Sequence, residues 1–156
     1  MIDRVSRDKL ATALRQYVSG RITNDDLDGI VVDWRDSGAI AVKERAWCLY
    51  DDLHDHKAIG KYHLDRAARD EIARWIIFLH SDVEYTWPRY SFDQIINWPM
   101  NLLTLGWWEK NKEKIFEQFK AAGDYSVWPF VTKEDFETAL ENPRYLVGSK
   151  ENRELR

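Results

Sequence analysis

Residues 64–80, LDRAARDEIARWIIFLH, contain the clearest helical pattern in the chain. Apolar residues recur there at the three- and four-residue spacing of one helical face, and they are Leu64, Ala68, Ile72, Trp75 and Leu79. The last turn, WIIFL at 75–79, is apolar on all sides. We therefore predict a helix over 64–80 whose C-terminal end is the most buried part of the molecule.

Two threonines belong to the same kind of helix-start signal. In ITNDDL at 22–27 and VTKEDF at 131–136, a threonine precedes acidic residues and is flanked by apolar residues that can pack across the first turn. Thr23 and Thr132 are therefore predicted N-caps. Further helices are predicted over 6–19, 39–55, 107–121 and 132–141, with Ser6 as the cap of the first helix and Gly20 as its end.

The fold class predicted from these patterns is all-α, because no run of alternating residues is long enough to predict a strand. We expect a single-domain helical bundle of about five to six helices over residues 1–146. It should include an aromatic-rich irregular segment at about 81–106 and be followed by a charged, flexible tail at 147–156. The core is predicted to contain Leu49, Leu53, Trp75, Ile76, Leu79 and Phe116.

Composition limits the compartment and the classes of partner. The single cysteine, Cys48, leaves no intramolecular disulfide, and the N-terminal residues contain no apolar signal core. No apolar run approaches the roughly 18 residues of a membrane-spanning helix. The net charge of −4 is spread over interspersed signs, whereas a nucleic-acid interface needs a basic face. We therefore expect a cytosolic protein that binds neither membrane nor nucleic acid.

Aromatic residues concentrate in one part of the chain. Residues 85–130 contain 12 aromatic residues in 46 positions, against 9 in the other 110. Trp–Pro pairs recur at 87–88, 98–99 and 128–129, and each proline stiffens the backbone next to an indole. Tryptophan and tyrosine on a stiff backbone are enriched at binding hot spots. We therefore predict a partner-binding surface formed by Tyr85, Trp87, Tyr90, Trp98 and Trp107.

The polar cluster YDDLHDH at 50–56 leads to a second hypothesis. Asp52 and His56 are one helical turn apart, and with His80 and Asp82 they could form a metal site that activates water for hydrolysis. The spacing fits no metal-binding signature, and histidines in the last turn of a helix also favour the negative end of its dipole. We therefore expect no bound metal, no cofactor and no catalytic residue.

Three functions remain open from the sequence. The preferred one is a small binding protein without catalytic turnover that engages another protein in an accessory, inhibitor or immunity-like role. The second is a metal-dependent hydrolase that uses the four residues Asp52, His56, His80 and Asp82. The third is a helical protein with a tryptophan-lined pocket for a small ligand. Each of the three is compatible with a homo-oligomer.

Overall fold

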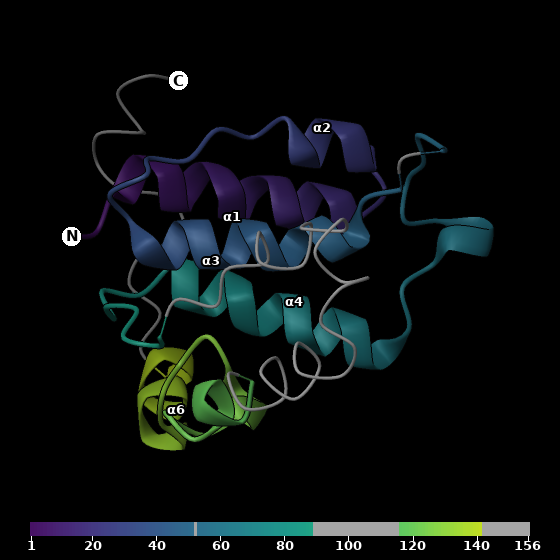
Figure 1. The fold of residues 1–156 in the computed structure, drawn as a ribbon. Helices are drawn as coiled ribbons and strands as arrows, with labels where there is room; N and C mark the ends of the chain where they lie inside the picture. The colour runs from purple at the N-terminus through teal and green to yellow at the C-terminus, as the bar shows by residue number, and fades with distance from the viewer. Residues whose placement is uncertain (52, 89–115, 142–156) are drawn as a thin grey trace, which may run out of the picture.

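The computed structural model describes residues 1–51, 53–88 and 116–141 (Figure 1). Within these ranges the chain forms helices and connecting segments with no β-strand, which confirms the predicted all-α fold. The α-helices are α1 (Arg4–Val18), α2 (Asn24–Asp28), α3 (Ser37–Ala46), α4 (Arg66–Leu79) and α6 (Lys133–Glu141). Short 3₁₀ turns are η1 (Trp47–Leu49), η2 (Gly60–Tyr62) and η5 (Tyr125–Val127), and residues 116–120 are helical as well.

Several predicted features lie outside the described residues. They are the tail at 147–156, most of the irregular segment, and most of the helix over 107–121. The single domain over 1–146 therefore stays a prediction. In the described part of the chain, no helix is long and apolar enough to cross a membrane.

The body of the fold consists of α1, α3 and α4, which lie side by side (Figure 1). α1 and α3 run in the same direction and α4 runs in the opposite one, so the starts of α1 and α3 meet the end of α4. α2 packs on α1, and α6 packs on α4. The core between these helices includes Leu10, Leu14, Tyr17, Val42, Ile72, Trp75, Phe78 and Leu79.

Local capping signals determine where the helices begin and end. Thr23 forms the predicted cap, because its hydroxyl accepts from the N–H of Asp26 at 3.2 Å and its own N–H donates to the Asp26 carboxylate at 3.0 Å. Thr132 accepts from the N–H of Asp135 at 3.1 Å. Gly20 ends α1 in the left-handed conformation, with φ of +69°. All three predictions are confirmed, and each depends on residues within one turn of each other.

The predicted cap of α1 is wrong by one turn. Asp3 is the N-cap in place of Ser6, and its carboxylate accepts from the N–H of Ser6 at 2.9 Å. Ser6 instead lies in the first turn, where its hydroxyl accepts from the N–H of Asp33 at 2.8 Å. Its side chain therefore joins α1 to the segment that leads into α3.

The helix predicted over 39–55 ends much earlier, because α3 gives way to η1 at Trp47. The chain beyond η1 is held by the buried Asn24 of α2, whose side-chain oxygen accepts from the N–H of His56 at 2.6 Å. The side-chain nitrogen of Asn24 lies 3.4 Å from the carbonyl oxygen of His54. This tertiary contact holds the segment in a non-helical loop, despite its helical spacing of apolar residues.

Two of the six predicted core residues are exposed. Leu53 is 84% exposed, because it lies in the loop that Asn24 holds outside the helix. Phe116 is also exposed, whereas Phe119, three residues later in the same helical stretch, is buried and takes the inward position. The other four are buried or pack against the core, and they are Leu49, Trp75, Ile76 and Leu79.

A buried ion pair joins the three long helices at one end of the bundle. The side chain of Arg7 is 1% exposed and donates to both carboxylate oxygens of Asp36, at 2.7 and 3.1 Å. The same guanidinium donates to the carbonyl oxygens of Ser81 and Val83, at 3.1 and 3.0 Å, just beyond the end of α4. One side chain of α1 therefore holds both the start of α3 and the exit of α4.

Asp36 is surrounded by donors as completely as Arg7 is by acceptors. Its carboxylate also accepts from the backbone N–H groups of Asp3, Gly38 and Ala39, at 2.9, 3.0 and 3.1 Å. Burial raises the pKa of the Asp36 carboxyl, but the hydrogen bonds and charge of Arg7 outweigh burial and leave this pKa below its usual value. Asp36 is therefore ionised at neutral pH, and its charge is fully paired.

Arg7→Met should lower the free energy of unfolding by about 3–5 kcal/mol, because it leaves the Asp36 charge buried without its partner. Arg66→Met is the matched control, since Arg66 is exposed on α4 and lies 3.8 Å from Asp70. That variant should change the free energy of unfolding by about 0.5 kcal/mol or less. Urea denaturation measures both values. If both variants lose the same free energy of unfolding, the buried ion pair of Arg7 does not stabilise the fold more than an exposed one.

Candidate functional site

The described part of the predicted aromatic surface is buried or half-buried. Trp87 is 4% exposed, and its indole N–H donates to the carbonyl oxygens of Pro129 and Phe130, at 3.1 and 3.2 Å. Tyr85 is half-buried, its hydroxyl accepts from the indole N–H of Trp128 at 3.3 Å, and burial raises its pKa to about 12. Trp87 is therefore a core residue, contrary to the expected surface position. The other three predicted residues, Tyr90, Trp98 and Trp107, lie outside the described residues.

These rings are buried because aromatic residues from distant segments pack against α4. Trp75 meets Trp128 edge to face, with ring centroids 6.1 Å apart. Phe78 meets Phe130 at 5.3 Å and Tyr85 at 6.3 Å, again edge to face. Edge-to-face contacts at these distances stabilise aromatic pairs beyond the burial of their area. The high aromatic density of this part of the chain therefore builds a second part of the core.

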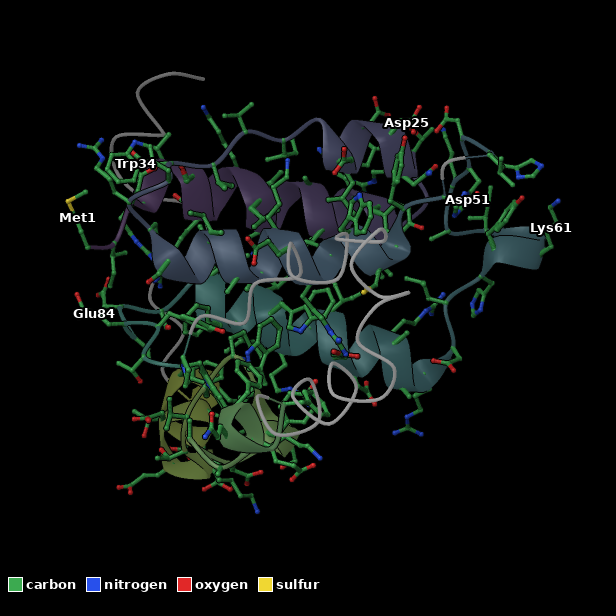
Figure 2. The ribbon with its side chains drawn as sticks, viewed as in Figure 1. Met1, Asp25, Trp34, Asp51, Lys61 and Glu84 are labelled. Atoms are coloured by element: carbon green, nitrogen blue, oxygen red, sulfur yellow. The ribbon has the colours of Figure 1, made fainter. Side chains whose placement is uncertain are left out.

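Among the described residues, the most exposed aromatic ring is that of Trp34, at 76%. It lies in the turn of residues 33–36, which the N–H of Asp36 closes by donating to the Asp33 carbonyl oxygen at 3.1 Å (Figure 2). The backbone N–H and the guanidinium of Arg35 donate to the Asp33 carboxylate, at 2.9 and 2.6 Å. These bonds lower the pKa of Asp33 to about 2. Trp34 is thus displayed on a closed, ion-paired turn.

Both ends of this turn are anchored to the bundle. Asp36 is half of the buried pair with Arg7, and the N–H of Asp33 donates to the hydroxyl of Ser6 on α1. The backbone is therefore held on either side of Trp34. A ring on a backbone that is already ordered loses less conformational freedom when a partner covers it.

Two other exposed apolar residues lie close to Trp34 along the chain or in space. Val31 is 81% exposed and precedes the turn, and the exposed Met1 precedes Asp3, whose N–H donates to Asp36. Figure 2 shows Met1 and Trp34 at the same end of the bundle, where Glu84 also lies. We refer to Met1, Val31 and Trp34 together as the Trp34 surface.

A small pocket lies at the other end of α3, beside the exposed Trp47. It has room for about one water molecule. The pocket includes a tryptophan, as the small-ligand hypothesis requires, but it is too small for an organic ligand. Its lining consists of Leu10, Asn24, Leu27, Asp28, Lys43, Ala46, Trp47 and Tyr50.

The two histidines of the predicted metal site have different neighbours. The Nε2 atom of His56 lies 3.3 Å from the hydroxyl oxygen of Tyr17, whereas His80 is buried between Asp8 and Arg15. Among the described residues, no three His, Cys, Asp or Glu side chains come together as metal ligands would. Of the other two predicted ligands, Asp82 is exposed and Asp52 lies outside the described residues.

His80 is a buried, neutral histidine at the end of α4. Burial lowers the pKa of its imidazole to about 4, and the positive charges of Arg15 and Arg4 lower it as well, while Asp8 opposes the shift. The imidazole is therefore uncharged at neutral pH, and its Nε2 accepts from the Arg15 guanidinium. This contact joins α4 to α1.

Comparison with known proteins assigns no relative to the chain. No protein-family model matches it, and no match was found among curated proteins or among solved structures. The described geometry alone therefore supports the choice of a functional site.

Sequence reasoning missed Trp34 because aromatic density pointed to residues 85–108. A usable signal is the run DWRD at 33–36, since aspartate is common at the first position of turns and at helix N-caps. A tryptophan enclosed by two such aspartates lies in a tight turn. Its ring then has no neighbouring position on a helix face to cover it.

Labelling with 5-fluorotryptophan should separate exposed from buried indoles. The ¹⁹F resonances of Trp34 and Trp47 should shift when H₂O is replaced by D₂O, because both rings are exposed. The resonances of Trp75, Trp87 and Trp128 should be insensitive, because these rings are buried. Single Trp→Phe variants assign the signals. A solvent-shielded Trp34, or a solvent-exposed Trp87, would contradict this pattern.

His80 should make the protein less stable as the pH falls from 7 to 5. The unfolded imidazole binds a proton with a pKa of about 6.5, whereas the folded one does so only near 4. The contribution of the neutral His80 to the free energy of unfolding is therefore complete above about pH 6.5. This free energy decreases by about 2 kcal/mol between pH 7 and pH 5. His80→Gln, which cannot titrate, should lack this part of the pH dependence in urea denaturation.

Trp47→Ala supplies the control for this measurement, because Trp47 is exposed and its side chain carries no titratable group. This variant keeps His80 and should keep the pH dependence of the wild type. An unchanged pH dependence in His80→Gln would show that the buried imidazole is not the group responsible.

Proposed function

We propose that this chain is a binding protein without catalytic turnover, which engages another protein through the Trp34 surface. The observation that carries the proposal is the 76% exposure of Trp34 on a turn fixed by a buried ion pair. Tryptophan is among the residues most enriched at the hot spots of protein interfaces. Its indole offers a partner a large apolar area together with one hydrogen-bond donor.

An indole held in this way favours binding for two physical reasons. Burial of a hot-spot side chain in a fitting pocket is worth about 2 kcal/mol or more. The entropy lost on docking is smaller than for a ring on a free loop, because Asp33 and Asp36 already hold the turn. The charged groups of Asp33 and Arg35 beside the ring can supply the polar rim that surrounds such a hot spot.

This surface differs from the one predicted from aromatic density. It is formed by Met1 and Trp34, at the end of the bundle where α1 and α3 begin, and by Val31 three residues before Trp34. An accessory, inhibitor or immunity-like role in the cytosol is part of the proposal, because proteins of these classes act by covering a partner's surface. The metal-dependent hydrolase gains no specific support from the described residues.

Trp34→Ala should remove partner binding and leave the fold intact. Immobilised wild-type, Trp34→Ala and Trp47→Ala proteins are exposed to an extract of the source cells, and the retained proteins are identified by mass spectrometry. A partner of the Trp34 surface should be retained by the wild type and by Trp47→Ala, and lost from Trp34→Ala. For that partner in purified form, Trp34→Ala should raise Kd roughly 30-fold.

Trp47→Ala is the matched control because Trp47 is also exposed but lies at the other end of α3. Both variants should keep the circular dichroism spectrum and the urea midpoint of the wild type, within the small change expected of surface substitutions. If Trp34→Ala retains the same proteins with the same affinity as the wild type, the proposed function is wrong.

A further inference from the structure

Positive charge gathers at the end of the bundle where α1 ends and α4 begins (Figure 1). The 13 residues 57–69 contain four basic side chains and one acidic one, a net charge of +3, whereas the other 143 residues contain 19 basic and 26 acidic ones, a net charge of −7. A Cβ atom at Gly20 would lie 2.6 Å from Cγ2 of Ile59, so Ile59 packs against the end of α1, and Arg21 is the next residue. We refer to five exposed residues as the basic surface, namely Arg21, Lys57, Lys61, Arg66 and Arg69.

Most of this positive charge has no counter-charge in the described part of the chain. Of the five residues, only Arg66 has a carboxylate partner there, Asp70 at 3.8 Å, and both side chains are exposed. The guanidinium of Arg69 contacts the His63 imidazole, and the Lys61 ammonium lies 4.6 Å from the centre of the Tyr62 ring. Neither contact neutralises a charge. Like charges that are held together without counter-charges raise the local potential and attract an anionic partner.

The backbone that carries these charges is held at three points. The N–H of His56 donates to the Asn24 side chain at 2.6 Å, and the Tyr62 ring stacks on the His56 imidazole with centroids 3.9 Å apart. At the other end, the Asp65 carboxylate caps α4 by accepting from the N–H of Ala68 at 2.8 Å. Between these points, η2 stands clear of α1, α3 and α4 (Figure 1). A partner that docks on an ordered backbone causes a smaller loss of entropy.

We propose that the basic surface binds an acidic segment of a partner protein, which covers Ile59 with an apolar residue of its own. Ile59 is 57% exposed and lies two residues from both Lys57 and Lys61. The acidic side chains of the segment pair with the lysine and arginine side chains around this apolar contact. The Trp34 surface lies at the opposite end of the bundle, so this site is separate from the proposed function (Figure 2).

The surroundings of the basic surface favour a short acidic segment over a nucleic acid or an anionic membrane. Asp25 and Asp51 lie at the same end of the bundle as Lys61 (Figure 2). A nucleic acid is charged along its whole length, so phosphates beyond the basic surface would meet these carboxylates and the net negative charge of the rest of the chain. An anionic membrane would meet the same repulsion. In a protein segment, acidic side chains can be confined to the few positions that face the basic surface.

An NMR titration of the ¹⁵N-labelled full chain tests the site with the acetylated and amidated peptide Glu-Glu-Leu-Glu-Glu. At roughly 50 mM salt we expect the amide resonances of Arg21 and residues 57–69 to shift with a Kd below about 1 mM. Roughly 0.5 M salt should weaken binding, because exposed ion pairs are screened. The peptide Gln-Gln-Leu-Gln-Gln should not bind. Glu-Glu-Ser-Glu-Glu should bind more weakly than the leucine peptide, because it has no apolar side chain to cover Ile59.

Lys57→Gln/Lys61→Gln should raise the Kd of the leucine peptide about fivefold or more, because it removes two of the exposed charges that pair with the peptide. Lys9→Gln/Lys133→Gln is the matched control, since it removes the same charge from exposed positions on α1 and α6. That variant should keep the Kd of the wild type within about twofold. Both variants should keep the circular dichroism spectrum of the wild type, because all four lysines are exposed.

The inference is overturned if these amides do not shift at roughly 5 mM peptide, or if both double variants raise the Kd equally. Equal binding of the leucine and serine peptides would overturn the contact with Ile59. Tighter binding of a thymidine oligonucleotide of roughly ten residues, or of vesicles that contain phosphatidylserine, would overturn the protein segment as the partner. Trp34→Ala should bind the peptide as the wild type does, so failure here leaves the proposed function of the Trp34 surface intact.

Discussion

The buried ion pair of Arg7 and Asp36 is the interaction on which the arrangement of the helices depends. Removing two charges from water costs several kcal/mol per ion, so such a pair is tolerated only where its remaining donors and acceptors are also paired. Here the guanidinium donates to two carbonyl groups after α4, and the carboxylate accepts from three backbone N–H groups at the starts of α1 and α3. Because these partners belong to three helices, both charges are fully paired only when α1, α3 and α4 meet in this register. We interpret the pair chiefly as a source of specificity for this arrangement.

The same ion pair connects the fold to the candidate binding surface. The Asp36 carboxylate caps α3, and the Asp36 N–H closes the turn that carries Trp34. Because the buried Arg7 of α1 binds this carboxylate, Arg7 sets the position of the turn and of the exposed indole. The hydroxyl of Ser6 holds the other side of the turn. A short connection between two helices is thereby held about as firmly as the helices themselves, which is what a preorganised binding site requires.

Some aromatic residues pack in the core and others are exposed on the surface, and composition alone does not distinguish the two groups. Most of the described rings after residue 74 pack edge to face between α4 and the segment around η5, and Arg74 of α4 donates to the Trp128 carbonyl oxygen at 3.1 Å in the same region. These contacts extend the core to the side of α4 that faces away from α1. The exposed rings of Trp34 and Trp47 lie instead at the two ends of α3, where the sequence shows no aromatic cluster.

The sequence by itself determined the all-α fold, the start signals at Thr23 and Thr132, and the end of α1 at Gly20. These features depend on hydrogen bonds and side-chain spacings within one turn, so a local pattern contains all the information they need. The tertiary structure decided where α3 ends and which tryptophans are exposed. The Asn24–His56 contact that holds the chain after α3 joins residues 32 positions apart, and the bonds that bury Trp87 join residues 42 and 43 positions apart. Trp34, in contrast, is exposed because no distant segment of the described chain packs over its turn. The exposure of a side chain depends on what the rest of the chain brings against it, and a pattern within one segment does not contain that information.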